Sequence, residues 1–144
     1  MIIFFVNSII IFKQMKKLSL ILFGFILTSA LFAQTANITF EKSTHDFGKI
    51  KEKDGIATVV FSFKNTGDAP LVINRVQASC GCTTPSWTKE PIMPGKTGNV
   101  TAAYNPANRP GTFIKSISVF SNAGSQPVLL TIKGDVIPKP SVER

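Results

Sequence analysis

Apolar and polar side chains alternate along most of the chain after its first 35 residues. Residues 57–64 show this most clearly, because Val59, Phe61 and Phe63 occupy every second position. Successive side chains of a β-strand point to opposite faces of the sheet. The period of two therefore predicts a strand that buries one face and leaves the other in solvent.

The same pattern predicts five further strands, at residues 37–42, 71–76, 98–104, 112–121 and 126–136. Clusters of turn-forming residues separate them, among them Asn65-Thr66-Gly67-Asp68-Ala69-Pro70 and Pro94-Gly95. We expect strands 57–64 and 71–76 to pair as antiparallel neighbours across the first of these turns. Short strands at regular intervals, without convincing helical periodicity, predict an all-β sandwich.

Two of the later strands also indicate which face is buried. Their apolar faces consist of Val128, Leu130 and Ile132 in one strand and of Phe113, Ile117 and Val119 in the other. Lys115 shares the apolar face of strand 112–121. Since a charged group is costly to bury, Lys115 predicts an edge position or a β-bulge there.

Residues 1–33 differ from the rest because they are almost wholly apolar. Met15-Lys16-Lys17 precedes Leu18–Ala33, a run of 16 mostly apolar residues that ends in a small one. This order is typical of a secretory signal peptide, and the run is shorter than the roughly 20 residues of a spanning helix. We expect a signal peptide at 1–33 and one β-sandwich domain at 34–144, with an ordered core at about 37–137.

The signal peptide predicts an extracytoplasmic location, in the periplasm or secreted, and a mature form without a membrane span. Cleavage is expected after Ala33, although Leu31 is larger than the residue preferred three positions before the cut. A second apolar run, Met1–Phe12, precedes the basic cluster instead of following it. Two hypotheses account for this run: translation begins at Met15, or the run is an N-terminal membrane segment.

The charge of the chain is basic but dispersed. Removal of Lys13, Lys16 and Lys17 with the signal peptide lowers the net charge from +8 to +5. Nucleic-acid-binding proteins concentrate such charge on one stripe or helix, so no nucleic-acid partner is expected. Lys49–Lys53 is the only dense stretch, and it is interrupted by Glu52. It is interpreted as a solvated loop, with attraction to an acidic envelope surface as the alternative.

The main candidate for chemistry is Ser79-Cys80-Gly81-Cys82-Thr83, which contains both cysteines of the chain. Three hypotheses remain open for Cys80, Gly81, Cys82 and Thr83. The motif is a structural turn with two thiols or a local disulfide, which export makes plausible. It is a soft-metal site, since paired thiolates favour copper(I) or zinc. Or it has a redox function, against which the spacing counts, because redox pairs usually have two intervening residues.

A complete metal site needs further ligands, and two thiolates alone leave a tetrahedral ion half open. The mature chain offers one histidine, His45, and one methionine, Met93, neither near the cysteines in sequence. His45 is interpreted as a packed residue at a strand end. We therefore expect no bound metal and no cofactor.

An enzymatic function is not expected. The chain has no Gly-x-Ser-x-Gly elbow and no glycine-rich phosphate loop. Trp87 is expected to close one end of the sandwich, with its indole N–H donating to a carbonyl. The alternative is that Trp87 is an exposed aromatic used for recognition.

Several motifs together carry a family resemblance: Asp46-Phe47-Gly48-Lys49-Ile50, the stretch from Phe61 to Ile73, Ser79-Cys80-Gly81-Cys82-Thr83, Pro94-Gly95, and Gly111-Thr112-Phe113 leading to Ser121-Asn122. In their order and spacing, the chain resembles exported bacterial domains of unknown function with a Cys-Gly-Cys-Thr motif. These domains are related to the Hydin-like and major-sperm-protein-like immunoglobulin folds. The resemblance covers roughly residues 40–137 and implies an immunoglobulin-like sandwich of about seven strands and an envelope location.

The sequence thus predicts an exported, non-catalytic binding or structural module of the cell envelope. Its partner would be another envelope protein or a surface polymer. The alternative is a metal-handling or thiol-redox protein that uses Cys80 and Cys82.

Overall fold

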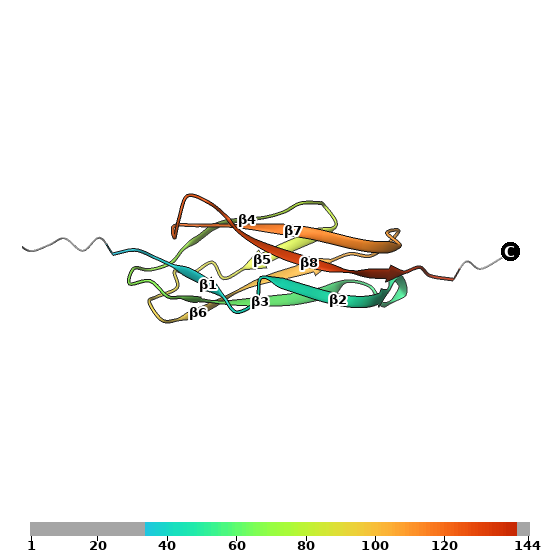
Figure 1. The fold of residues 1–144 in the computed structure, drawn as a ribbon, viewed down its shortest axis with the longest axis horizontal. Helices are drawn as coiled ribbons and strands as arrows, with labels where there is room; N and C mark the ends of the chain where they lie inside the picture. Colours follow the sequence, from blue (N-terminus) through green and yellow to red (C-terminus); the bar gives the residue numbers. More distant parts are fainter. Residues whose placement is uncertain (1–33, 141–144) are drawn as a thin grey trace, which may run out of the picture. The chain divides into compact units, whose positions relative to one another are not determined.

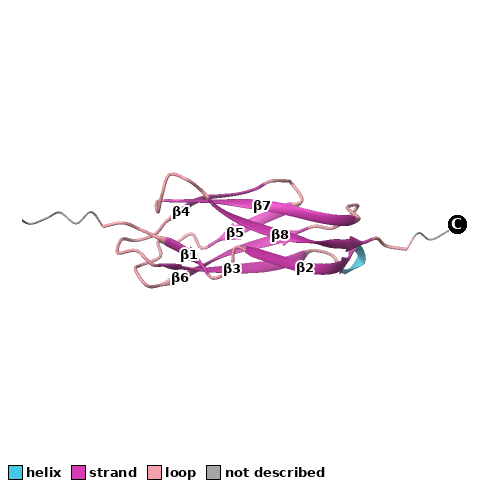
Figure 2. Cartoon of the chain, in the orientation of Figure 1, coloured by secondary structure: helices cyan, strands magenta, loops and turns pink. Residues whose placement is uncertain are grey.

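A computed structural model describes residues 34–140 of the chain. It is a sandwich of two four-stranded sheets (Figures 1 and 2). The strands are β1 (Ile38–Phe40), β2 (Thr44–Lys51), β3 (Ala57–Asn65), β4 (Ile73–Ala78), β5 (Thr83–Trp87), β6 (Thr97–Tyr104), β7 (Gly111–Ser121) and β8 (Val128–Ile137). One short 3₁₀ turn, η1 (Glu52–Asp54), lies between β2 and β3. The all-β sandwich predicted from the sequence is confirmed.

One sheet has the strand order β1-β3-β6-β5 and the other the order β2-β8-β7-β4. All pairs are antiparallel except β2 with β8, which run parallel. The expected pairing of strands 57–64 and 71–76 is therefore wrong. β3 pairs with β1 and β6, whereas β4 pairs with β7 in the opposite sheet. Each of these strands has an apolar face, and placing them in facing sheets buries both faces against each other.

The six predicted strands are all present, and two more were not predicted. β2 was missed because only a few of its positions are apolar and a bulge after Asp46, near the positive-φ Gly48, breaks its alternation. β5 was missed because it is short and contains Pro85. Both are edge strands, where polar residues and proline are tolerated.

The buried faces agree with the alternation in the sequence. Phe61, Phe63, Ile117, Val119, Leu130 and Ile132 are at most 3% exposed. Lys115 is half-buried on β7, which is a central strand. However, β4 pairs with β7 only as far as Ile117, and Ser79 extends this contact to Ser116. Lys115 therefore lies where β7 has only β8 beside it, so the expected edge position is correct locally although β7 is central.

Asn65, the last residue of β3, fixes the crossing from one sheet to the other. Its side chain is fully buried and its amide nitrogen donates to the carbonyls of Ala69 and Ile92, both at 2.8 Å. Its Oδ1 accepts from the N–H groups of Gly67 (3.0 Å) and Asn37 (3.4 Å). One amide thus bonds to four backbone groups from three segments, so the buried side chain of Asn65 ties the turn to its neighbours without leaving its own polar atoms unpaired.

Among residues 34–140, no helix has the length and hydrophobicity needed to cross a membrane. Residues 1–33, which include the predicted signal peptide and Met15, lie outside the described residues.

Candidate functional site

The Cys80-Gly81-Cys82 turn connects β4 in one sheet to β5 in the other. Cys80 and Cys82 form a disulfide, and their Cα atoms are 5.2 Å apart. This distance lies within the usual range for a bridge. Backbone hydrogen bonds anchor the turn on both sides: Ser79 N–H donates to Ser116 O (2.9 Å), and Asn105 N–H donates to Cys82 O (2.8 Å).

The two cysteines differ in exposure. Cys82 is only 6% exposed, because it enters β5, where the next residue, Thr83, pairs with Tyr104. Cys80 is half-buried and Gly81 is exposed. No atom lies within 4 Å of the position that a side chain at Gly81 would occupy, so the turn opens towards solvent.

Thr83 is buried beside the bridge. Its Oγ1 lies 3.8 Å from Sγ of Cys80 and 3.9 Å from Sγ of Cys82. These are the only polar partners of this hydroxyl among the described residues. A disulfide sulfur is a weak acceptor. Thr83 is only 4% exposed, so its hydroxyl lies against partners that satisfy it poorly.

The structure does not bring His45 or Met93 to the cysteines. His45 lies within β2, where it pairs with Ile132 and makes an edge contact with Phe47 at 4.5 Å between ring centroids. Met93 lies in the β5–β6 connection, at the opposite end of β6 from Tyr104. Within residues 34–140, no group of three or more His, Cys, Asp or Glu side chains is placed to hold a metal ion.

Trp87 closes a side of the sandwich instead of an end. It is the last residue of edge strand β5 and pairs with Val100 in the middle of β6. The Lys89 ammonium nitrogen lies 3.1 Å from the centroid of the indole ring, a cation–π contact. The expected hydrogen bond to a carbonyl is not formed: the indole Nε1 is buried without a partner in the described part of the chain.

Glu52 organises the end of the sandwich where the chain leaves β8. Its carboxylate accepts from the N–H of Asn108 (2.8 Å) in the β6–β7 connection and from the N–H of Lys139 (3.1 Å). These backbone hydrogen bonds hold the pKa of Glu52 below its ordinary value. Figure 2 shows the consequence, with η1 and the segment after β8 at the same end.

Three lysines surround a cavity of about 260 Å³ at this end. We call this surface the basic end; it is lined by Lys51, Lys53, Ile137, Pro138, Lys139 and Pro140. None of these six residues is acidic. Ile137 is 39% exposed; Ile56, which does not line the cavity but follows η1 in the chain, is 63% exposed. The surface therefore combines positive charge with accessible apolar side chains.

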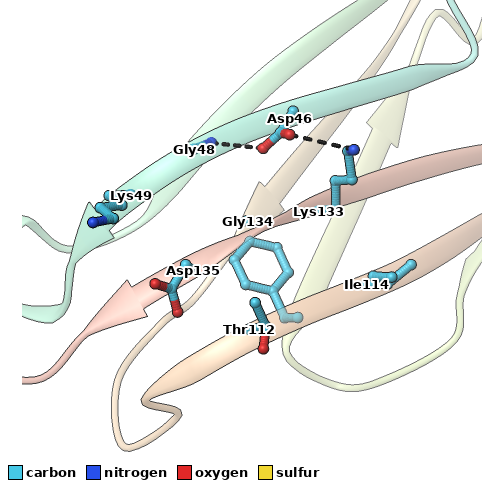
Figure 3. A pocket seen from close by; sticks show the side chains of 9 residues that line it. Asp46, Gly48, Lys49, Thr112, Ile114, Lys133, Gly134 and Asp135 are labelled. Carbon is cyan, nitrogen blue, oxygen red and sulfur yellow. Dashed lines mark hydrogen bonds and ion pairs between the residues drawn. The ribbon is translucent and has the colours of Figure 1, made fainter.

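A second, larger basin of about 370 Å³ lies over β2, β8 and β7 (Figure 3). Its rim carries both signs of charge: Lys133 forms an ion pair with Asp46 (3.3 Å), and Lys49 pairs in register with Asp135. The N–H of Gly48 and then Lys133 hold the pKa of Asp46 below its ordinary value. Because these charges compensate one another, the basin does not select a ligand of one sign.

The sequence singled out Cys80–Thr83 and left a local disulfide as one of several hypotheses; the structure forms that disulfide, with Thr83 beside it. The interpretation of Lys49–Lys53 as a solvated loop is wrong, because the segment up to Lys51 belongs to β2 and Lys53 lies in η1. The sequence also gave no indication that Lys139 lies with Lys51 and Lys53 around one cavity. Lys139 is 86 residues beyond Lys53 in the chain. The only signal was the presence of prolines on both sides of Lys139, which does not indicate a partner.

The geometry and the motif order agree with a known family. Residues 38–136 match the family described as "Protein of unknown function (DUF1573)", and the chain belongs to this family. No curated protein matches the chain in sequence.

Solved structures share the fold at low sequence identity. A protein of unknown function from Porphyromonas gingivalis W83 superposes with a TM-score of 0.63 at 19% identity, over 74% of this chain and 50% of that one. The VesB protease of Vibrio cholerae gives 0.56 at 16% identity, over 70% and 32%. A family 123 glycoside hydrolase from Clostridium perfringens gives 0.56 at 11% identity, over 73% and 27%.

These likenesses show the fold alone, a two-sheet β-sandwich that other bacterial proteins also contain. The chain spans half of the length of the Porphyromonas protein and about a third or less of the two enzymes.

Proposed function

We propose that this protein is an exported, non-catalytic binding module of the cell envelope. What supports the proposal most directly is the basic end, a surface of exposed lysines and apolar side chains. His45 and Met93, which the sequence offered as further metal ligands beside Cys80 and Cys82, lie in different parts of the sandwich.

The partner that fits this surface is an acidic envelope protein or an acidic surface polymer. Three lysines line one cavity, and the carboxylate of the neighbouring Glu52 is already bound by two backbone N–H groups. Clustered charge of one sign accelerates encounter with a partner of opposite sign and contributes specificity. Ile137 and Ile56 add apolar area that a partner would cover. We also propose kinship with the Hydin-like and major-sperm-protein-like domains, whose docking role would be analogous.

Reversal of the three charges tests the surface. The triple variant Lys51→Glu, Lys53→Glu and Lys139→Glu should bind the partner captured from an envelope extract about tenfold more weakly, or worse. The loss of affinity should be smaller at high salt, because salt screens the charges. The control is Lys42→Glu, Lys64→Glu and Lys96→Glu, which changes the net charge equally at exposed lysines outside the basic end. Binding would be measured by titration at low and high salt. Equal losses in both variants would reject the basic end, and no specific capture by the wild type would reject the module.

Export is tested separately. We expect cell fractionation to place the protein outside the cytoplasm, and intact mass to show a chain that begins near Gln34. The reason is the lysine pair followed by 16 mostly apolar residues that end at Ala33. A full-length chain in the cytosolic fraction would contradict this prediction.

A second candidate function uses Cys80 and Cys82. The formed bridge favours thiol chemistry over metal binding, because a disulfide offers no thiolate ligands. The positions of His45 and Met93 also leave the pair without the further ligands that a tetrahedral ion needs.

A further inference from the structure

We propose that the Cys80–Cys82 bridge is a site of thiol–disulfide exchange with the dithiol of a partner, and that Cys80 Sγ is the atom attacked. The inference develops the second candidate function and does not depend on the basic end. Three observations carry it: the unequal exposure of the two cysteines, the isolated hydroxyl of Thr83, and the small size of the ring that the bridge closes.

Exposure determines which sulfur a thiolate can reach. Cys80 is half-buried next to the exposed Gly81, around which the structure leaves open space. Cys82 is 6% exposed and is held by the hydrogen bond from Asn105 to its carbonyl. An external thiolate therefore approaches from the side of Gly81 and meets Cys80 first. Cys82 is the leaving group, retained on β5 in a fixed position.

Thr83 is placed to receive the charge that this attack releases. Its hydroxyl lies within 3.9 Å of both sulfur atoms and has no other polar partner among residues 34–140. A thiolate is a much better acceptor than a disulfide sulfur, because hydrogen bonds to ionised groups are roughly twice as strong. The hydroxyl is thus better satisfied once the bridge opens. The hydroxyl thus acts as a positioning donor for the thiolate. Many reactive thiolates are stabilised by a helix N-terminus, whereas this bridge lies between two strands.

The exchange balances in two steps. The partner's first thiolate attacks Cys80 Sγ, the Sγ–Sγ bond breaks, and its electron pair passes to Cys82, whose thiolate takes a proton or the Thr83 hydrogen bond. The partner's second thiolate then attacks the mixed disulfide and releases Cys80 as a thiolate. The bridge is reduced to two thiols while the partner's dithiol is oxidised to a disulfide, a transfer of two electrons.

The bridge can open without unfolding the sandwich. It joins residues two positions apart, so it closes a ring with a single residue between the cysteines. Such a ring constrains the unfolded chain little. The anchors on either side, Ser79 to Ser116 and Asn105 to Cys82, are backbone hydrogen bonds that do not involve sulfur. Both redox states therefore share one fold.

The test compares the two single-cysteine variants. With glutathione disulfide as the probe, Cys82→Ser leaves Cys80 as the free thiol and should form the mixed disulfide at least ten times faster than Cys80→Ser. Intact mass follows the reaction, and circular dichroism confirms that both variants are folded. Equal rates, or no reaction in either folded variant, would overturn the assignment of Cys80.

The role of Thr83 is tested by removing only its hydroxyl. In the Cys80→Ser background, Thr83→Val should shift the pH dependence of Cys82 alkylation to higher pH than in Cys80→Ser alone, because the thiolate has lost its hydrogen-bond donor. Thr83→Ser should restore the original pH profile. An unchanged profile in Thr83→Val would mean that the threonine only packs. In the wild type, reduction by dithiothreitol should precede unfolding; a bridge that resists reduction until the domain unfolds would overturn exchange altogether.

Discussion

Asn65→Ala should destabilise the domain by about 3–5 kcal/mol, because each buried backbone group left without a partner costs about 1–3 kcal/mol. The substitution removes the side-chain partner of four backbone groups: the carbonyls of Ala69 and Ile92 and the N–H groups of Gly67 and Asn37. The Ile92 carbonyl keeps a backbone hydrogen bond and Asn37 is exposed, so the cost arises mainly at the half-buried Ala69 and Gly67. The residue is fully buried, so water cannot readily replace the amide. Chemical denaturation at neutral pH measures the change in the free energy of unfolding.

Two further variants make this expectation specific. Asn74→Ala changes an exposed asparagine of β4 and should alter stability by less than about 0.5 kcal/mol. Asn65→Asp keeps the shape but turns two donors into acceptors that face the carbonyls of Ala69 and Ile92, so it should be about as destabilising as Asn65→Ala. A mild effect of both changes at Asn65 would show that the crossing between the sheets does not depend on this side chain.

Phe61→Ala should lower the free energy of unfolding by about 3–5 kcal/mol, as large aromatic truncations in cores do. Phe61 is 3% exposed and belongs to the core cluster between the sheets. The loss would be a large part of the total stability of a domain of this size, which is about 5–15 kcal/mol. Thermal and chemical denaturation of the purified domain would measure it.

Thr58→Ala is the matched control, because Thr58 lies on the same strand, three residues earlier, on the exposed face. It should change stability by no more than about 0.5 kcal/mol. Similar midpoints for the two variants would mean that β3 buries both faces or the opposite one.

The sequence alone determined the strands that bury an aliphatic or aromatic face. Around Phe61 and Leu130, a strand is the conformation that brings the alternating apolar side chains onto one face, and that face is buried. The sequence also placed Cys80, Cys82 and Thr83 together, because they are neighbours in the chain. The alternation did not predict the edge strands β2 and β5, because edge strands tolerate polar residues and an irregular backbone and need no regular burial of one face.

Only the tertiary structure decided which strands pair and which distant side chains meet. The turn after Asn65 looks locally like a hairpin, but the buried amide and the Leu71–Ile92 bridge direct the chain to the other sheet. The basic end depends on Lys139 folding back beside η1 through Glu52. Strand alternation is a local property of the chain, because it depends only on the order of neighbouring residues. Sheet order and surface clusters depend on contacts between segments far apart in sequence. The energies of these contacts cannot be derived from a local pattern of residues.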